Sequence, residues 1–152
     1  MAVFEFRTEL PCSVSGLFDF LIQPKNIAQV SDPGLGLVFV DPPEVLTPNL
    51  EIEFQIVSFG QVHNITHRIT ELTPKSTVIE KQISGPMKAW THTHTYEPTD
   101  NGCVKLDIVE FETPGGLVGF FLTEDKVSDQ LEDGFCYREE KLIQLIDQGE
   151  IS

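Results

Sequence analysis

Basic residues are scarce in this chain, which has 10 Lys and Arg against 24 Asp and Glu and a formal net charge of −14 at pH 7. Proteins that bind nucleic acid meet its phosphates with clustered Lys and Arg. Anionic membrane surfaces attract basic segments for the same reason. The charge balance therefore argues against nucleic acid and against an anionic membrane as partners.

Cysteines are also few, and long apolar runs are missing. Cys12, Cys103 and Cys136 are widely separated and form no C-x-x-C pair, so no disulfide framework is predicted. No stretch approaches the ~20 apolar residues that cross a bilayer. Residues 1–10 lack the basic and apolar regions of a signal peptide. We expect a cytoplasmic protein without membrane insertion.

What the chain does contain is enough apolar sequence for one well-packed domain. Its 152 residues are 40% hydrophobic and include eleven Phe, a composition too apolar for disorder and long enough to bury a substantial core. No repeat, low-complexity tract or linker divides it. We therefore predict a single domain over residues 1–152.

Hydrophobic spacing predicts an α+β fold with about seven strands. Apolar residues alternate with polar ones near 4–10, then recur at helical spacing in 14–21, and a short helix or loop follows over 26–36. Strand patterns cover 37–40, 50–56, 63–69, 75–83 and a hairpin within 85–116, and an amphipathic helix runs from about Val127 to Gly149. The order strand, two helices, six strands, helix predicts a curved antiparallel sheet gripping the last helix, with a cavity between them.

The hairpin has an unusually polar face. Its turn is predicted at 99–102, where Asn101-Gly102 readily supplies the positive φ of a tight turn. Because strand residues alternate between faces, Trp90, His92, His94 and Tyr96 share one side. A symmetric hairpin then places His94 opposite Asp107 and Trp90 opposite Phe111, and the preceding hairpin pairs Glu80 with His92.

Projecting all strands onto one sheet gathers these groups into a half-polar pocket. Such a mixture of aromatic, imidazole and carboxylate groups is typical of a small-molecule site. The candidate ligand-binding residues are Phe54, His67, Glu80, Gln82, Trp90, His92, His94, Tyr96, Asp107 and Phe111.

Four roles are open for the histidines and carboxylates. They can satisfy one another inside the domain without any chemistry, or they can anchor the polar end of a ligand whose apolar part meets Phe54 and Phe111. A His–carboxylate pair also suits general acid–base catalysis, although no nucleophile or oxyanion-binding group is evident. His-x-His facing a carboxylate is a possible iron or zinc set, but the full motif of a known metal fold is missing. We expect no metal and no other cofactor.

The chain resembles the helix-grip (START/Bet v1-like, SRPBCC) superfamily, in particular its polyketide cyclase/dehydrase and lipid-transport branch. The resemblance is carried by the element order and by GPMKAWTHTHTYEP (85–98), with support from Phe59-Gly60, Asp107, Phe111 before Pro114-Gly115, and Phe135-x-x-Arg138. Met87 stands where that branch usually has an aromatic residue. The resemblance implies a ligand cavity between the sheet and the long helix, and it does not name the ligand.

The sequence thus favours a non-enzymatic protein that binds a small apolar or amphipathic molecule. Two alternatives stay open. One is an enzyme of cyclase or dehydratase type, in which His92 or His94 works with Asp107 or Glu80. The other is an accessory or chaperone-type protein that binds a partner through its outer surface. The sequence does not fix the oligomeric state.

Overall fold

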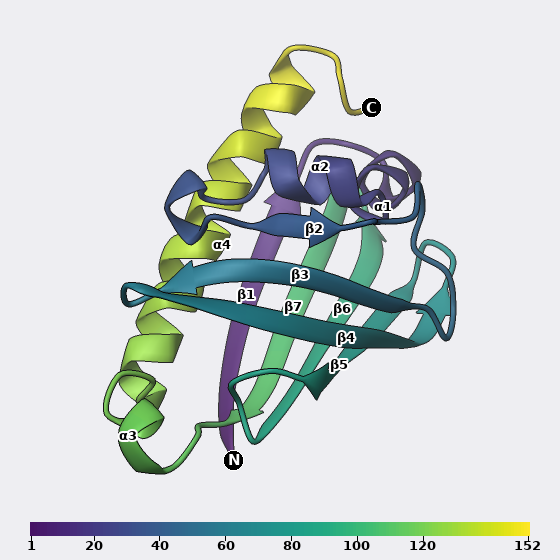
Figure 1. The fold of residues 1–152 in the computed structure, drawn as a ribbon. Helices are drawn as coiled ribbons and strands as arrows, with labels where there is room; N and C mark the ends of the chain where they lie inside the picture. Colours follow the sequence, from purple (N-terminus) through teal and green to yellow (C-terminus); the bar gives the residue numbers. More distant parts are fainter.

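A computed structural model describes residues 1–152 and contains the predicted series of elements (Figure 1). In chain order these are β1 (Ala2–Leu10), α1 (Val14–Leu21), α2 (Pro24–Gln29), the 3₁₀ helix η1 (Pro33–Leu35), β2 (Val38–Val40), β3 (Glu51–Ser58), β4 (Gln61–Thr73), β5 (Thr77–Ser84), β6 (Ala89–Thr99), β7 (Gly102–Glu112), α3 (Gly116–Gly119) and α4 (Glu124–Asp147). Only the four-residue α3 lacks a counterpart in the sequence prediction.

The seven strands form one antiparallel sheet in the order β1-β7-β6-β5-β4-β3-β2. Strands β2 to β7 follow one another as a meander, and β1 pairs with β7, so the first strand lies beside the last. The α+β class, the seven-stranded curved sheet and the long C-terminal helix are confirmed. Figure 1 shows the sheet wrapping around one side of α4, with α1 and α2 across one end.

Local sequence signals explain where the helices begin and end. Ser13 caps α1, because its hydroxyl accepts a hydrogen bond from the Gly16 amide at 2.9 Å. The first helix, α1, ends at Leu21, and Pro24 is the first residue of α2, a position where its missing N–H costs nothing. Beyond the end of α4, Gly149 has φ +77° and lets the chain turn away.

The hairpin of β6 and β7 has the predicted register, but the reason given for its turn was wrong. His94 pairs with Asp107 and Trp90 with Phe111 across the hairpin. Neither Asn101 nor Gly102 has positive φ. Gly102 serves close packing instead, since a Cβ on it would lie 2.0 Å from the Leu10 carbonyl oxygen. The β1–β7 pairing ends at this point.

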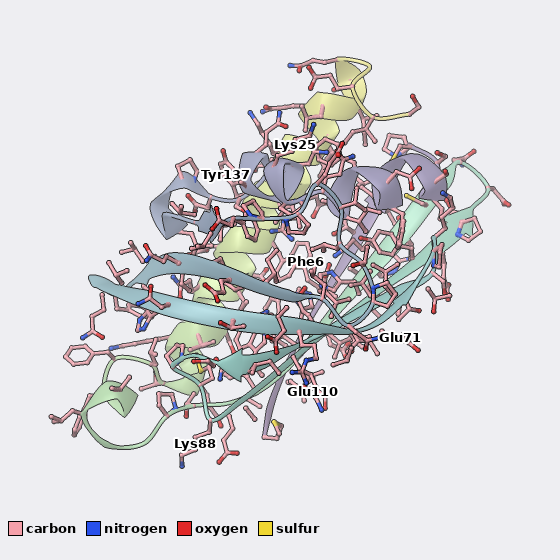
Figure 2. All side chains as sticks on the ribbon, turned by 45° about the vertical axis from the view of Figure 1, so that its right-hand side comes forward. Phe6, Lys25, Glu71, Lys88, Glu110 and Tyr137 are labelled. Atoms are coloured by element: carbon pink, nitrogen blue, oxygen red, sulfur yellow. The ribbon has the colours of Figure 1, made fainter.

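The two faces of the sheet carry different side chains at several positions. Figure 2 shows Glu71 and Glu110 projecting from the side away from α4, whereas Phe6 lies between the sheet and this helix. Phe6 and Phe4 both stack on Phe135 of α4, with ring centroids 5.4 and 5.8 Å apart. No helix is both long and apolar enough to cross a membrane.

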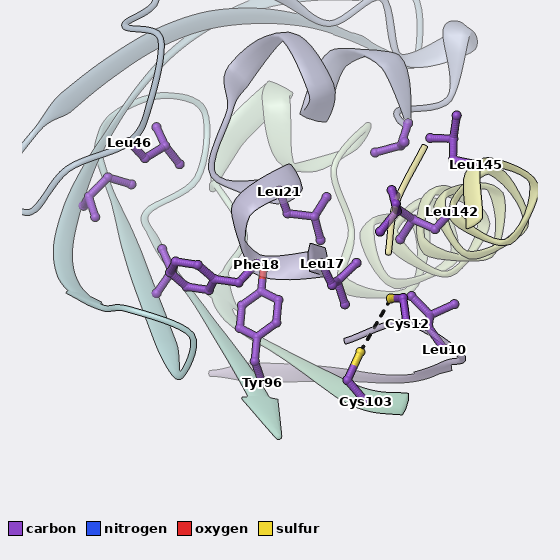
Figure 3. Close-up of a cluster of buried hydrophobic side chains, with 14 of the residues drawn as sticks. Leu10, Cys12, Leu17, Phe18, Leu21, Leu46, Tyr96, Cys103, Leu142 and Leu145 are labelled. Carbon is purple, nitrogen blue, oxygen red and sulfur yellow. Dashed lines mark hydrogen bonds between the residues drawn. The ribbon is translucent and has the colours of Figure 1, made fainter. Parts of the chain in front are cut away.

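The hydrophobic core is divided into two clusters, one under each half of α4. The larger cluster packs α1 against the sheet and against Leu142 and Leu145, as Figure 3 shows. The smaller one packs Phe135 and Val127 against Phe111 and its neighbours. Because neither cluster fills the centre, space remains between the sheet and the helix.

Candidate functional site

A cavity of about 500 Å³ occupies that space. It is lined by 34 residues, of which 18 are hydrophobic, contributed by α1 to η1, the middle strands and α4. The volume is within the usual range for small-molecule sites, as is a mainly apolar wall with a few polar groups. The predicted cavity between sheet and long helix is therefore present in the structure.

Eight of the ten candidate ligand-binding residues line this cavity. They are Phe54, His67, Glu80, Gln82, Trp90, His92, His94 and Tyr96. The other two do not reach it. Asp107 lies behind the histidines with 1% of its surface exposed, and Phe111 is fully buried in the smaller core cluster. Both lie on the inward face of β7, as predicted, but Asp107 is covered by His92 and His94 and Phe111 packs against Trp90.

The polar residues form one continuous network along β4 to β7. Glu80 accepts hydrogen bonds from His67 Nδ1 at 2.8 Å and from His94 Nε2 at 3.0 Å. Asp107 accepts one from His92 Nε2 at 2.7 Å. His67, His92 and His94 therefore each have a carboxylate partner. The partners are diagonal neighbours, since the register pairs Glu80 with His92 and His94 with Asp107 and long side chains reach the diagonal position.

Lys105 joins the two halves of this network and was missing from the predicted site. Its side chain is 3% exposed and donates hydrogen bonds to Asp107 Oδ1 and, at 3.0 Å, to His94 Nδ1. The same nitrogen, His94 Nδ1, also lies 3.2 Å from Asp107 Oδ1. Strand alternation already placed Lys105 on the inward face beside Asp107, so the signal for its role was present in the sequence.

Burial and ion pairing have opposite effects on the pKa values of the charged groups in the network. Burial raises the pKa of Asp107, but the Lys105 ammonium and the hydrogen bonds from His92 and His94 outweigh it and hold this pKa well below its usual range. Burial likewise opposes ionisation of Glu80, whose pKa is nevertheless held low by His67 and His94. Lys105 shows the reverse balance, because burial lowers its pKa more than Asp107 raises it.

His92 is an imidazole of the network whose surroundings disfavour protonation. Burial, followed by the neighbouring His94, lowers the pKa of His92 to about 4, although Asp107 acts in the opposite direction. The two rings stack with centroids 3.7 Å apart, and the edge of His92 meets Phe135. At neutral pH His92 is therefore an uncharged ring on the cavity wall.

Glu80, His92 and His94 offer ligand atoms within 4.8 Å of one another, close enough to surround a metal ion. Those same atoms already have partners inside the network. His92 Nε2 bonds to Asp107, and His94 bonds to Glu80 and Lys105. An entering cation would have to displace these bonds and lie near the Lys105 ammonium, so the residues fit a closed hydrogen-bonded network better than a metal centre.

The remaining candidates shape the wall. The Gln82 side-chain amide donates to the Met87 carbonyl at 2.7 Å and accepts from its amide at 3.4 Å, which fixes the loop before β6. Met87 itself lines the cavity, at the position where the resembled branch has an aromatic residue. Phe54 packs edge-on against His67 with centroids 4.9 Å apart, and Tyr96 does the same against Phe18 of α1.

Comparison with known proteins supports the fold and no finer assignment. No family model matches the chain, and no curated protein matches it either. Solved structures do. Protein CV1439 from Chromobacterium violaceum superposes with a TM-score of 0.72 at 14% identity, over 95% of this chain and 97% of that one. Ara h 8.0201 superposes with a TM-score of 0.70 at 15% identity, over 97% of this chain and 98% of that one. TTHA0849 from Thermus thermophilus superposes with a TM-score of 0.70 at 12% identity, over 94% of this chain and 98% of that one. The chain therefore has the helix-grip fold.

Proposed function

We propose that this protein binds a small, largely apolar molecule in the cavity between the sheet and α4. The observation that carries the proposal is an unfilled space of about 500 Å³ whose wall is mainly apolar but contains a buried polar network. A core of this size normally packs without such a void. An accessory protein that used only its outer surface would have no need of an unfilled cavity, so this alternative is disfavoured.

Gly134 offers a way to close the cavity without disturbing the protein. It lines the cavity from α4, and a Cβ added to it meets no atom within 4 Å. Replacing it also removes a residue that weakens helices. Gly134→Phe should therefore keep the fold and occupy the ligand's space, while Gly134→Ala changes the helix alone and serves as the matched control.

The test is a titration with the neutral fluorescent probe N-phenyl-1-naphthylamine. We expect saturable one-to-one binding to the wild-type protein and to Gly134→Ala. Gly134→Phe should bind at least about tenfold more weakly, a loss of ~1.4 kcal/mol. Equal affinity for all three proteins would place the probe outside the cavity and contradict the proposal.

An enzymatic function of cyclase or dehydratase type, as in the branch that the sequence resembles, is the second candidate. It is favoured by one observation, the contact of His92 with Asp107 at 2.7 Å beside the cavity. The carboxylate orients this uncharged ring, which can accept a proton from a bound substrate, but a pKa of about 4 makes it a weak base at neutral pH. The test is turnover of a polyketide-type substrate by wild type and His92→Gln. Turnover that persists in the variant would eliminate this role.

A further inference from the structure

Arg138 is a basic side chain on the cavity wall that has no acidic partner in the protein. Lys105 and Arg138 are the two basic residues lining the cavity. Lys105 is neutralised by Asp107. Arg138 takes part in none of the molecule's salt bridges. Its guanidinium is therefore a positive group at the cavity wall without an ion-pair partner.

The hydrogen bonds of this guanidinium are also incomplete. Its one hydrogen bond runs from Nη2 to the Ser31 hydroxyl oxygen, at 3.3 Å, and that hydroxyl already donates to the Ile27 carbonyl at 2.6 Å. Arg138 Nε is buried and has no partner. On one side the group rests over the Phe135 ring, with 5.6 Å from Cζ to the centroid. A buried donor without an acceptor is costly, so an acceptor on a bound molecule would stabilise this group.

The acidic residues along the cavity do not supply that anion. Glu80 is held by His67 and His94. Asp32 accepts a hydrogen bond from the Gly34 amide at 2.9 Å, which caps η1. Asp133 is exposed and lies five residues before Arg138 on α4, so it is not at the three- or four-residue spacing that brings helix side chains together.

The charge of Arg138 acts toward the interior of the cavity. Burial and Asp107 raise the pKa of Tyr96 well above its ordinary value, and the charge of Arg138 opposes that rise. The same charge adds to the effect of burial in lowering the pKa of Lys105. An anion entering the cavity would thus meet a positive charge beside a mainly apolar wall, where the attraction is stronger than in water.

We infer that Arg138 binds the carboxylate of an amphipathic ligand whose apolar part fills the cavity. The guanidinium fork matches a carboxylate in two parallel hydrogen bonds, and such a ligand would supply the missing counter-charge and an acceptor for the free N–H groups. The inference rests on the proposed function and adds the ligand's chemical class, an apolar carboxylic acid.

The test compares two molecules that differ mainly in the head group, decanoic acid and 1-decanol. Each displaces N-phenyl-1-naphthylamine from wild type, Arg138→Gln and Arg138→Lys at pH 7. Arg7→Gln is the control, since Arg7 is 60% exposed and pairs with Glu9 on the surface. Urea unfolding of every variant establishes that it is folded under the assay conditions.

We expect Arg138→Gln to weaken decanoate binding about tenfold or more and to change decanol binding less than about twofold. Arg138→Lys should fall between wild type and Arg138→Gln for decanoate, because it keeps the charge and loses the fork. Arg7→Gln should match wild type for both molecules.

The inference is overturned if Arg138→Gln weakens both molecules equally, which would assign Arg138 a purely structural role. It is also overturned if decanoate binding is unchanged. Failure of the wild type to bind the neutral probe and decanol is a different result, because it would remove the proposed cavity function itself.

Discussion

Removing the Lys105 ammonium should destabilise the protein strongly, because a buried carboxylate loses its ion-pair partner. Asp107 and Lys105 are 1% and 3% exposed and form a direct ion pair. In Lys105→Met the aliphatic part of the side chain is kept, while Asp107 retains only its histidine donors. Breaking a buried pair from one side typically costs about 3–5 kcal/mol. Since His92 still donates to Asp107 at 2.7 Å, we expect the lower end, ~3 kcal/mol.

The assay is equilibrium unfolding in urea at pH 7, followed by circular dichroism. The control is Lys88→Met, since Lys88 is 58% exposed and 3.9 Å from Glu112. Pairs of this kind contribute little, so the control should change the free energy of unfolding by less than ~0.5 kcal/mol. The double variant Lys105→Met/Asp107→Asn removes both charges and should recover more than ~1 kcal/mol of the loss.

Two results would refute this reasoning. The first is a loss below ~1 kcal/mol in Lys105→Met, which would mean that Asp107 is protonated or hydrated in the folded protein. The second is a double variant at least as unstable as the sum of the single variants. In that case the two charges would not be coupled, and the network would not depend on the ion pair.

Three further predictions concern stability. The pKa of His92 is lowered from 6.5 to about 4 on folding, so the unfolded chain binds more protons between these pH values. The free energy of unfolding should therefore fall as pH drops through this window, by as much as ~3 kcal/mol. In urea titrations, His92→Gln should make the free energy of unfolding depend less on pH over the same window. Gly134→Ala should raise the free energy of unfolding by ~0.5–1 kcal/mol, since it lies in a helix with open space around it. Gly102→Ala should lower the free energy of unfolding by ~1–3 kcal/mol, because the new Cβ meets the Leu10 carbonyl. An unchanged melting temperature in either glycine variant would contradict the packing described.

Much of the fold was predictable because its signals are local and periodic. Alternation over β1 and over the hairpin determined which face is buried, and helical spacing located α4. The position of the turn gave the register of β6 and β7, and the preceding hairpin gave that of β5 and β6, so His94 opposite Asp107 and Glu80 opposite His92 were both correctly predicted. What the register did not reveal was the diagonal choice of hydrogen-bond partners, which depends on rotamers and on the position of Lys105.

The parts of the site that sequence reasoning missed depend on contacts between distant elements. The role of Arg138 becomes evident only where α4 meets Ser31 of the segment after α2, 107 residues away in sequence. Asp107 and Phe111 face inward as predicted, but whether an inward residue reaches the cavity depends on what packs over it. The division of the core into two clusters likewise follows from three-dimensional packing and not from any one pattern in the sequence.

The central claim, uptake of an apolar molecule into the cavity, can be tested through the single tryptophan. Trp90 lines the cavity, and its indole N–H is buried without a partner, so an ¹⁵N-labelled sample gives one indole resonance from this wall. Titration with 1-decanol should shift that resonance in a saturable way, together with amides of Gly134 and Phe135. Shifts confined to the exposed apolar side chains near Leu117 and Phe120, with the indole resonance unmoved, would contradict the account.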